Sequence, residues 1–183
     1  MSVQAKHGGP LSEEEFRKFT LYMNGSNNRE DDQQRARILG FTAEGVRVAP
    51  GAVVRVSDSA SIHRDVYIGL YSYINGDVTL HPRVLVGPQV SIVASNHRYS
   101  PEDDCFSART DPAQGRVVIE HGVWLTTGVV VTPGCTIGRC SLVCANSVVT
   151  SDIPPYTIVA GSPARKIGEI DRHTGEYRWM RED

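Results

Sequence analysis

The sequence has no long run of apolar residues and no marked surplus of either charge. Its 183 residues include 19 Lys or Arg and 21 Asp or Glu, which gives a formal net charge of −2 at pH 7. This balance argues against a nucleic-acid-binding protein, because the neutralisation of phosphates requires a basic stripe. Without a long apolar run or a signal-peptide pattern, the chain is expected to be cytoplasmic and not to span a membrane.

Cysteines are few and lack the spacing of a zinc or redox motif. The chain contains four of them, at Cys105, Cys135, Cys140 and Cys144. They form neither a C-x-x-C pair nor a zinc-ligand pattern, so we expect reduced, structural cysteines, three of which fall on repeat positions as small fillers, and no bound metal. A Gly-rich nucleotide-binding domain is also missing. The length of 183 residues fits one compact domain with a buried core.

What the sequence does contain is an aliphatic residue at every sixth position. The series comprises Val56, Ile62, Ile68, Ile74, Leu80, Val86 and Ile92, and then Ile119, Leu125, Val131, Ile137, Val143 and Val149. Four positions after each of these residues except Ile92 comes a small or β-branched residue, at Ala60, Val66, Ser72, Val78, Val84, Val90, Val123, Val129, Cys135, Ser141, Ser147 and Ile153. A period of six fits neither a helix nor a long strand, but it fits a short strand that turns a corner. The period therefore predicts an all-β solenoid, a parallel β-helix whose layers bury the aliphatic column.

The segment of residues 1–45 lacks the repeat and has helical patterns instead. Ser12 and Glu15 form a capping box ahead of an amphipathic run. A second helical run, Arg29–Leu39, ends at Gly40, which is typical of a helix C-terminus. We expect an N-terminal helical cap over the first coil or, alternatively, one lip of an acceptor pocket.

One long excursion loop interrupts the expected β-helix domain of residues 46–163. Residues 98–118 are polar and rich in turn-forming residues, which indicates a loop that leaves the core and returns to it. His97 lies directly before this loop, and long loops in compact domains are often functional. The last residues, 164–183, are expected to form a C-terminal tail.

Four sequence features accompany the repeat. They are Asn96-His97 at the base of the excursion, Val123-Trp124-Leu125, Asp152-Ile153-Pro154-Pro155 and Ala160-Gly161-Ser162-Pro163-Ala164-Arg165. With these features the chain resembles the hexapeptide-repeat acyltransferases from Val46 to Ile167, and it is most similar to their galactoside, maltose and nodulation-factor O-acetyltransferase branch. The resemblance implies a left-handed parallel β-helix with three hexapeptides in each eighteen-residue turn. It also implies a homotrimer with active sites between subunits, and acetyl-CoA as co-substrate.

The activity implied by the resemblance requires a general base. A hydroxyl group is barely ionised at neutral pH, so its attack on a thioester needs a group that accepts its proton. An imidazole with an ordinary pKa near about 6.5 can accept that proton and return it to the departing thiolate. The family's catalytic histidine matches His97, which we expect to be the catalytic residue. The other histidines of the repeat region, at His63, His81 and His121, are expected to be surface residues.

The resemblance also assigns the remaining site residues. Those expected to contact the acceptor or the acyl group are Asn75, Asn96, Thr127 and Trp124. Those expected along the coenzyme A groove are Ala145, Thr150, Ser151, Arg165 and Lys166. The planar guanidinium of Arg165 suits a phosphate because it can donate two hydrogen bonds to it. The alternative for these positions is an ordinary structural role in a turn, a wall or a polar cap.

The chain departs from the family pattern at two points, and two other functions stay open. The acidic acceptor-binding residue of the sugar acetyltransferases has no counterpart, and the second C-terminal arginine falls at Gly168. A γ-carbonic anhydrase shares the coil but needs a histidine pair near the loop, and no histidine follows His97 before His121. A non-catalytic scaffold or binding module would keep the repeat, but it has no need of His97 together with Trp124.

Overall fold

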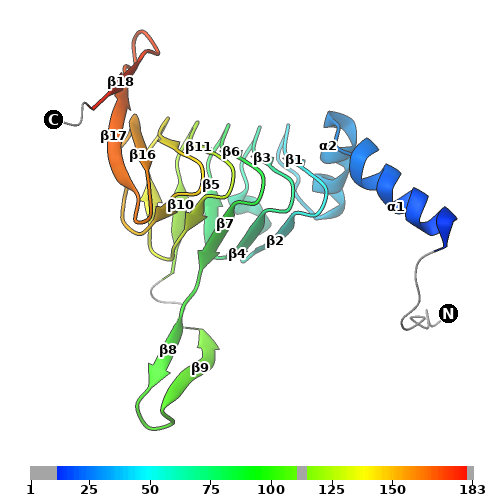
Figure 1. Cartoon of the computed structure of the whole chain (residues 1–183), viewed down its shortest axis with the longest axis horizontal. Coiled ribbons are helices and arrows are strands. Elements are labelled where there is room, and N and C mark those ends of the chain that lie inside the picture. The colour runs from blue at the N-terminus through cyan, green and yellow to red at the C-terminus, as the bar shows by residue number, and fades with distance from the viewer. Residues whose placement is uncertain (1–11, 111–114, 181–183) are drawn as a thin grey trace.

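The protein is a stack of parallel coils with a helical segment at one end. The structure, a computed structural model, describes residues 12–110 and 115–180. A β-hairpin projects from the side of the stack, and antiparallel strands close the end opposite the helices (Figure 1). The predicted parallel β-helix is therefore confirmed.

Three sheets form the walls of the solenoid. The largest, sheet A, contains β1 (Arg47–Val48), β3 (Tyr67–Ile68), β6 (Leu85–Val86), β11 (Trp124–Leu125), β14 (Leu142–Val143), β16 (Thr157–Ala160), β17 (Arg165–Ile170) and β18 (Tyr177–Trp179). Sheet B contains β2 (Val53–Val56), β4 (Tyr73–Gly76), β7 (Ser91–Ala94), β12 (Val130–Val131) and β15 (Val148–Val149). Sheet C contains β5 (Val78–Leu80), β10 (Val117–Ile119) and β13 (Thr136–Ile137). Each coil visits the sheets in the order A, B, C.

The register between coils is eighteen residues through the middle of the stack. Tyr67 pairs with Leu85 in sheet A, and Val118 pairs with Thr136 in sheet C. The predicted aliphatic column points inward, and its members from Ile62 to Val149 are buried. Short walls with one large inward side chain each thus build a continuous core across the coils.

The first coil departs from the predicted column. Val54 pairs with Ile74, twenty residues away, so Val54 and not Val56 occupies the column position there. The two extra residues are taken up before Ile62, around the short 3₁₀ helix η1 (Ser59–Ser61), in which Ala60 is exposed. The predictions for Val56 and Ala60 were therefore wrong, because six-residue counting cannot detect a turn that absorbs two residues.

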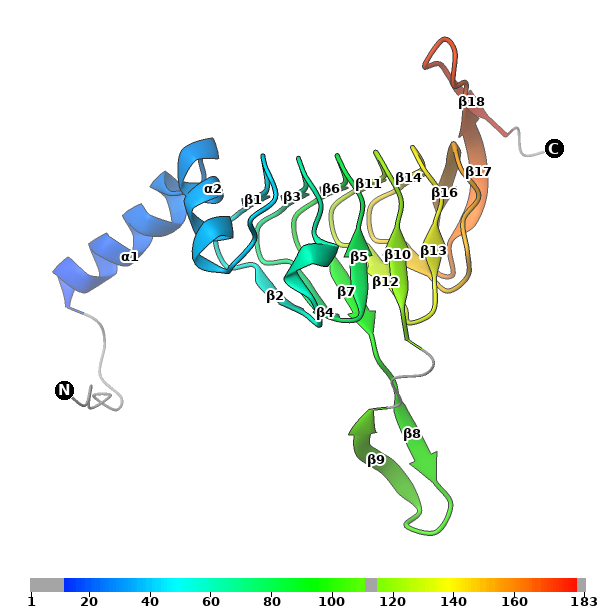
Figure 2. The same cartoon turned by 180° about the vertical axis from the view of Figure 1, so that it is seen from behind.

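The N-terminal segment forms the two predicted helices. Helix α1 (Glu13–Gly25) begins with the predicted capping box, in which Ser12 and Glu15 each bond the other's backbone N–H. Helix α2 (Arg29–Ile38) packs on the first coil, where the Arg35 Nε donates to the Val48 carbonyl at 2.8 Å. Helix α1 continues away from the solenoid (Figure 2). In residues 12–110 and 115–180, no helix is long and apolar enough to cross a bilayer.

The excursion is a two-stranded hairpin. Strands β8 (His97–Ser100) and β9 (Cys105–Thr110) pair antiparallel and project from the stack (Figure 1). Strands β7 and β12 pair 39 residues apart instead of eighteen, so the insertion comprises 21 residues. Because the wall resumes with Val117 in β10, the inserted residues are 96–116, two positions earlier than the expected 98–118.

Candidate active site

Most of the predicted site residues lie at or beside two corners of the triangular coil, whereas Trp124 lies on a wall in β11 and Arg165 and Lys166 lie in β17. The BC corner, between sheets B and C, follows β7, β12 and β15, and includes residues 132–135 and 150–152. The AB corner, between sheets A and B, includes residues 126–129 and 144–147. Six residues at about 3.3 Å each separate successive corners, so two corners of one coil lie roughly 15–20 Å apart.

His97 stands where the hairpin leaves the BC corner. It is the first residue of β8, its side chain is exposed, and its Nδ1 lies 2.8 Å from the Ser107 carbonyl oxygen on β9. A carbonyl oxygen only accepts hydrogen bonds, so this contact requires a proton on Nδ1. In the neutral ring the Nε2 then carries the lone pair, and it is free to accept a proton. The backbone of the hairpin thus selects the tautomer that a general base needs.

Asn75 and Asn96 belong to the same corner as His97. Asn75 pairs with Val93 on the next coil, and Asn96 follows Val93 by three residues. The register places Thr150 in the Asn75 column, three coils further along sheet B. At about 4.8 Å for each strand, Asn75 and Thr150 are separated by about 14 Å along the stack. The BC corner therefore forms a line of polar residues that runs from the hairpin toward the C-terminal end.

A pocket at the end of this line gathers most of the predicted coenzyme residues. It has a volume of about 180 Å³, and its lining includes Thr150, Ser151, Arg165 and Lys166. The Lys166 ammonium forms an ion pair with Glu169, whose pKa is lowered by that hydrogen bond. Within residues 12–110 and 115–180, the Arg165 guanidinium donates only to the neutral Ala164 carbonyl, at 2.9 Å. Arg165 is therefore the better placed of the two cations to receive a phosphate.

Trp124, Thr127 and Ala145 lie elsewhere on the coil. Trp124 is on the outer face of β11, is 45% exposed and pairs with Leu85 and Leu142. Thr127 is exposed at the AB corner, where its carbonyl accepts the Asn146 N–H at 2.9 Å. Ala145 occupies the equivalent place on the following coil. A single chain therefore does not bring these three residues to the corner that carries His97.

Several contacts at the site were missed by the sequence analysis. The Ser107 carbonyl reaches His97 because β8 pairs with β9, and Glu169 reaches Lys166 within β17, three residues further along the strand. Gly168 explains the absent second arginine, because a Cβ atom there would lie 2.7 Å from the Arg178 carbonyl oxygen. Strand β18 thus occupies the space that a side chain at this position would need. In the sequence, only the spacing of residues could have indicated these contacts.

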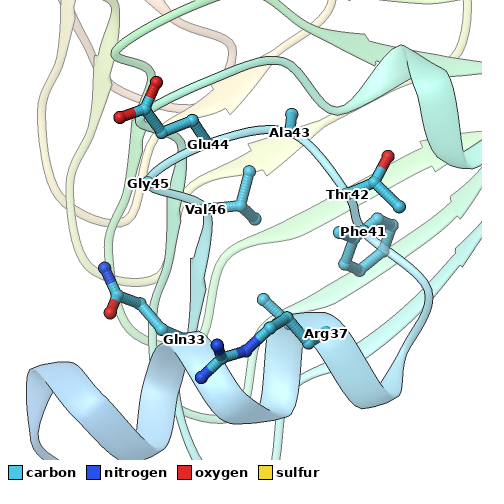
Figure 3. Close-up of a pocket in the computed structure, with 9 residues that line it drawn as sticks. Gln33, Arg37, Phe41, Thr42, Ala43, Glu44, Gly45 and Val46 are labelled. Carbon is cyan, nitrogen blue, oxygen red and sulfur yellow. The ribbon is translucent and has the colours of Figure 1, made fainter.

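Another pocket lies at the opposite end of the molecule from the Arg165 pocket. It has a volume of about 500 Å³ and is formed between α2 and the first coil, and its lining includes Gln33, Arg37, Phe41 and Glu44 (Figure 3). None of the predicted site residues lines it. Within one chain, the N-terminal helical segment therefore does not line a pocket together with His97, as the alternative of an acceptor lip would need.

Among the described residues, no cluster of three or more His, Cys, Asp or Glu side chains is arranged to hold a metal ion.

Comparisons with known sequences identify related enzymes. No family model matches the chain. Galactoside O-acetyltransferase of Escherichia coli is 30% identical over 174 residues, which are 91% of this chain and 84% of that protein. A putative acetyltransferase of Schizosaccharomyces pombe is 40% identical over 96 residues, which are 51% of this chain and only 44% of that protein.

Solved structures of acetyltransferases share the solenoid. A maltose O-acetyltransferase from Clostridium difficile superposes with a TM-score of 0.63 at 26% identity, covering 87% of this chain and 86% of that one. A hexapeptide-repeat acetyltransferase from Vibrio cholerae, complexed with acetyl coenzyme A, gives a TM-score of 0.51 at 27% identity, covering 86% and 88%. Sequence and structure thus point to the same group of enzymes.

Proposed function

This chain belongs to the hexapeptide-repeat acetyltransferases and is an acyltransferase, and on that premise we propose that it moves an acetyl group from acetyl-CoA to a hydroxyl of a saccharide or saccharide-like acceptor. The observation that carries the proposal is the hydrogen bond between His97 Nδ1 and the Ser107 carbonyl. This bond leaves Nε2 as the basic nitrogen of the neutral ring, at the corner that also carries Asn75 and Asn96. A related enzyme named for galactosides and another named for maltose support a saccharide as acceptor.

The transfer needs no covalent intermediate on the enzyme. His97 Nε2 accepts the proton of the acceptor hydroxyl while its oxygen attacks the thioester carbonyl. When the tetrahedral intermediate collapses, the C–S bond breaks and the imidazolium returns the proton to the departing thiolate. The products are an acetyl ester and free coenzyme A, and the histidine ends in its starting state.

Donors must stabilise the oxyanion that forms on the thioester carbonyl. Fixed hydrogen-bond donors of this kind contribute on the order of 3 kcal/mol each. Thr127 and Asn75 are the proposed contributors, with Trp124 beside the thiol end of the coenzyme. Because Thr127 and Trp124 lie away from the BC corner, they act from a second copy of the chain in a homotrimer. Outward-facing apolar side chains on sheet A support that assembly, since Leu85 is 41% exposed and Trp124 45%.

The coenzyme is proposed to run along the BC corner toward the C-terminal end. Its thioester lies near His97, its pantetheine arm passes Ala145 of the adjacent copy and Thr150, and its phosphates meet Arg165. The bound acetyl coenzyme A of the Vibrio cholerae relative supports this ligand. Since acetyl-CoA is supplied inside cells, we place the reaction in the cytoplasm.

Thiol release from acetyl-CoA tests the function. The purified protein is assayed with galactosides, maltose, nucleotide-sugars and hydroxylated antibiotics, and with buffer alone. We expect release that depends on an acceptor, and a KM for acetyl-CoA raised about tenfold in Arg165→Gln because a charge-assisted phosphate contact is lost. Arg172→Gln, which removes an arginine outside the pocket, serves as the matched control and should leave KM unchanged. Silence with every acceptor, together with no binding of coenzyme A, would favour a non-catalytic scaffold.

A further inference from the structure

The third corner of the solenoid carries basic residues that the proposed reaction does not use. This CA corner joins sheet C to sheet A, and it carries three arginines and three histidines on four successive coils. The residues are His63 and Arg64, His81 and Arg83, His121, and Arg139. Their stacking follows the register of the walls, in which Leu80 pairs with Ile119 and Ile119 with Ile137. Residues that are far apart in the sequence therefore form one ladder.

Two hollows lie along this ladder. One, of about 380 Å³, includes His63 and Arg64 in its lining, and the other, of about 350 Å³, is lined by His81, Glu120, His121 and Arg139. The His63 and His81 rings stack between them, with centroids 5.0 Å apart and an angle of 16° between the planes. Three coil steps of about 4.8 Å separate Arg64 from Arg139, which makes the ladder about 14 Å long. This length suits a chain-like ligand better than a single small ion.

The three guanidinium groups of the ladder are available to a ligand. Arg64, Arg83 and Arg139 are exposed, and none of them forms a salt bridge within the part of the chain that the structure describes. Three carboxylates accompany them. Asp65 and Glu120 belong to the ladder, and Glu44 lies beside Arg64 on the preceding coil, by the register of β1 with β3. Glu120 Oε2 accepts the backbone N–H of Arg139 at 2.8 Å, so its position is fixed by the turn.

Protonation of His81 changes the charge of the corner. The three arginines are balanced by the carboxylates of Glu44, Asp65 and Glu120, and a protonated His81 adds a positive charge. The groups that face His81 are His63 on the preceding coil, and Glu120 and His121 on the following coil. Partial burial lowers the pKa of His81, and repulsion from His63 lowers it further, whereas Glu120 opposes the shift. A bound anion would favour the charged form, so anion binding and proton uptake reinforce each other.

We propose that the CA corner is a binding site for an acidic polysaccharide, which lies along the ladder with its carboxylates against Arg64, Arg83 and Arg139. We choose a glycan over another polyanion because the proposed function gives the enzyme a saccharide as acceptor, and this inference rests on that proposal. A second observation favours it over a single-stranded nucleic acid, which binds through aromatic side chains that stack on its bases. Besides the histidines, the four coils of the ladder present no aromatic side chain at this corner. The site would hold a polymer outside the reaction centre while one of its sugars is acetylated.

A binding measurement without turnover tests the site. The probe is a tetramethylrhodamine-labelled oligogalacturonate of about twelve units. Its carboxylates stay ionised and its dye does not titrate from pH 5.5 to 7.5, so a pH effect reports the protein. Fluorescence anisotropy should show binding about tenfold tighter at pH 5.5 than at pH 7.5. For three arginine contacts, the logarithm of the association constant should fall with the logarithm of salt concentration with a slope of about −2.

Matched variants locate the site. Arg64→Gln/Arg139→Gln should weaken binding about tenfold at pH 5.5, because two charge-assisted contacts are lost. Arg29→Gln/Arg172→Gln removes the same charge from elsewhere on the surface and should bind like the unaltered protein. Equal weakening in both double variants, equal binding of a twelve-residue oligothymidylate, or no binding of the glycan would overturn the proposal.

A failure of this site is distinguishable from a failure of the proposed reaction. His97→Asn should abolish thiol release and leave the anisotropy titration unchanged, because His97 lies on the BC corner. Arg64→Gln/Arg139→Gln should retain thiol release with a small neutral acceptor. Loss of that release in a folded variant would contradict the separation of the two sites.

Discussion

The walls of the solenoid and the hairpin that leaves them are built on opposite principles. In the walls, large side chains such as Ile92 and Leu125 are fully buried, and most neighbouring coils pair with the same eighteen-residue register. In the hairpin, His97 and Tyr99 are exposed, and Phe106 is 72% exposed although it packs edge-to-face on Tyr99 with ring centroids 5.8 Å apart. The walls therefore supply stability, and the hairpin carries the proposed general base.

The contrast shows how this fold separates stability from function. A side chain that points inward is constrained by the coils above and below it, so the interior has little freedom to vary. A corner residue or an inserted hairpin is constrained only by local turns, and can carry chemistry without disturbing the core. The proposed reaction centre, the coenzyme pocket and the basic ladder all lie on corners.

The largest effect should come from removing the hairpin. Deletion of residues 96–116 joins Ser95 to Val117 and restores an uninterrupted eighteen-residue coil, because the insertion comprises 21 residues. We expect thiol release to be abolished, since His97 is lost, while circular dichroism still reports a β-solenoid that unfolds cooperatively. A deletion variant that is unfolded under the same conditions would show that the walls need the hairpin in order to fold, which contradicts the separation of stability from function.

A smaller effect is expected on the free energy of unfolding, and it should differ between the walls and the hairpin. Leu125→Ala empties part of a fully buried position and should lower the free energy of unfolding by about 3 kcal/mol, within the usual range for such substitutions. Phe106→Ala, in the exposed hairpin, should lower it by about 0.5 kcal/mol. Denaturant titrations of both variants measure the difference. Equal losses would mean that the hairpin contributes to the core of the folded assembly.

Much of the fold could be predicted because its information is local and periodic. Each six-residue wall repeats the same choice of a large inward residue, so the sequence alone predicts the coil from Ile62 onward. The first coil was misread at Val56, since the 3₁₀ turn at Ser59–Ser61 absorbs two residues without changing the composition of the segment. The helices were predictable from their caps, which are also local signals.

The candidate site was harder to predict from the sequence than the fold, because its contacts join residues that are distant in the sequence. His97 was found through its motif, but the Ser107 carbonyl that orients its ring becomes a neighbour only when β8 pairs with β9. The basic ladder was missed for a similar reason. A net charge of −2 conceals it, since residues such as Arg64 and Arg139 come together only when the coils stack.

The central claim is that His97 acts as the general base of an acyl transfer. Steady-state thiol release from acetyl-CoA, measured with the best acceptor for the unaltered protein, His97→Ala and the control His173→Ala, tests it most directly. We expect kcat to fall about 100- to 10,000-fold in His97→Ala, with coenzyme A binding retained, and to stay unchanged in His173→Ala. A kcat for His97→Ala within about twofold of the unaltered protein would contradict the claim, since an effect that small is far below that of removing a general base.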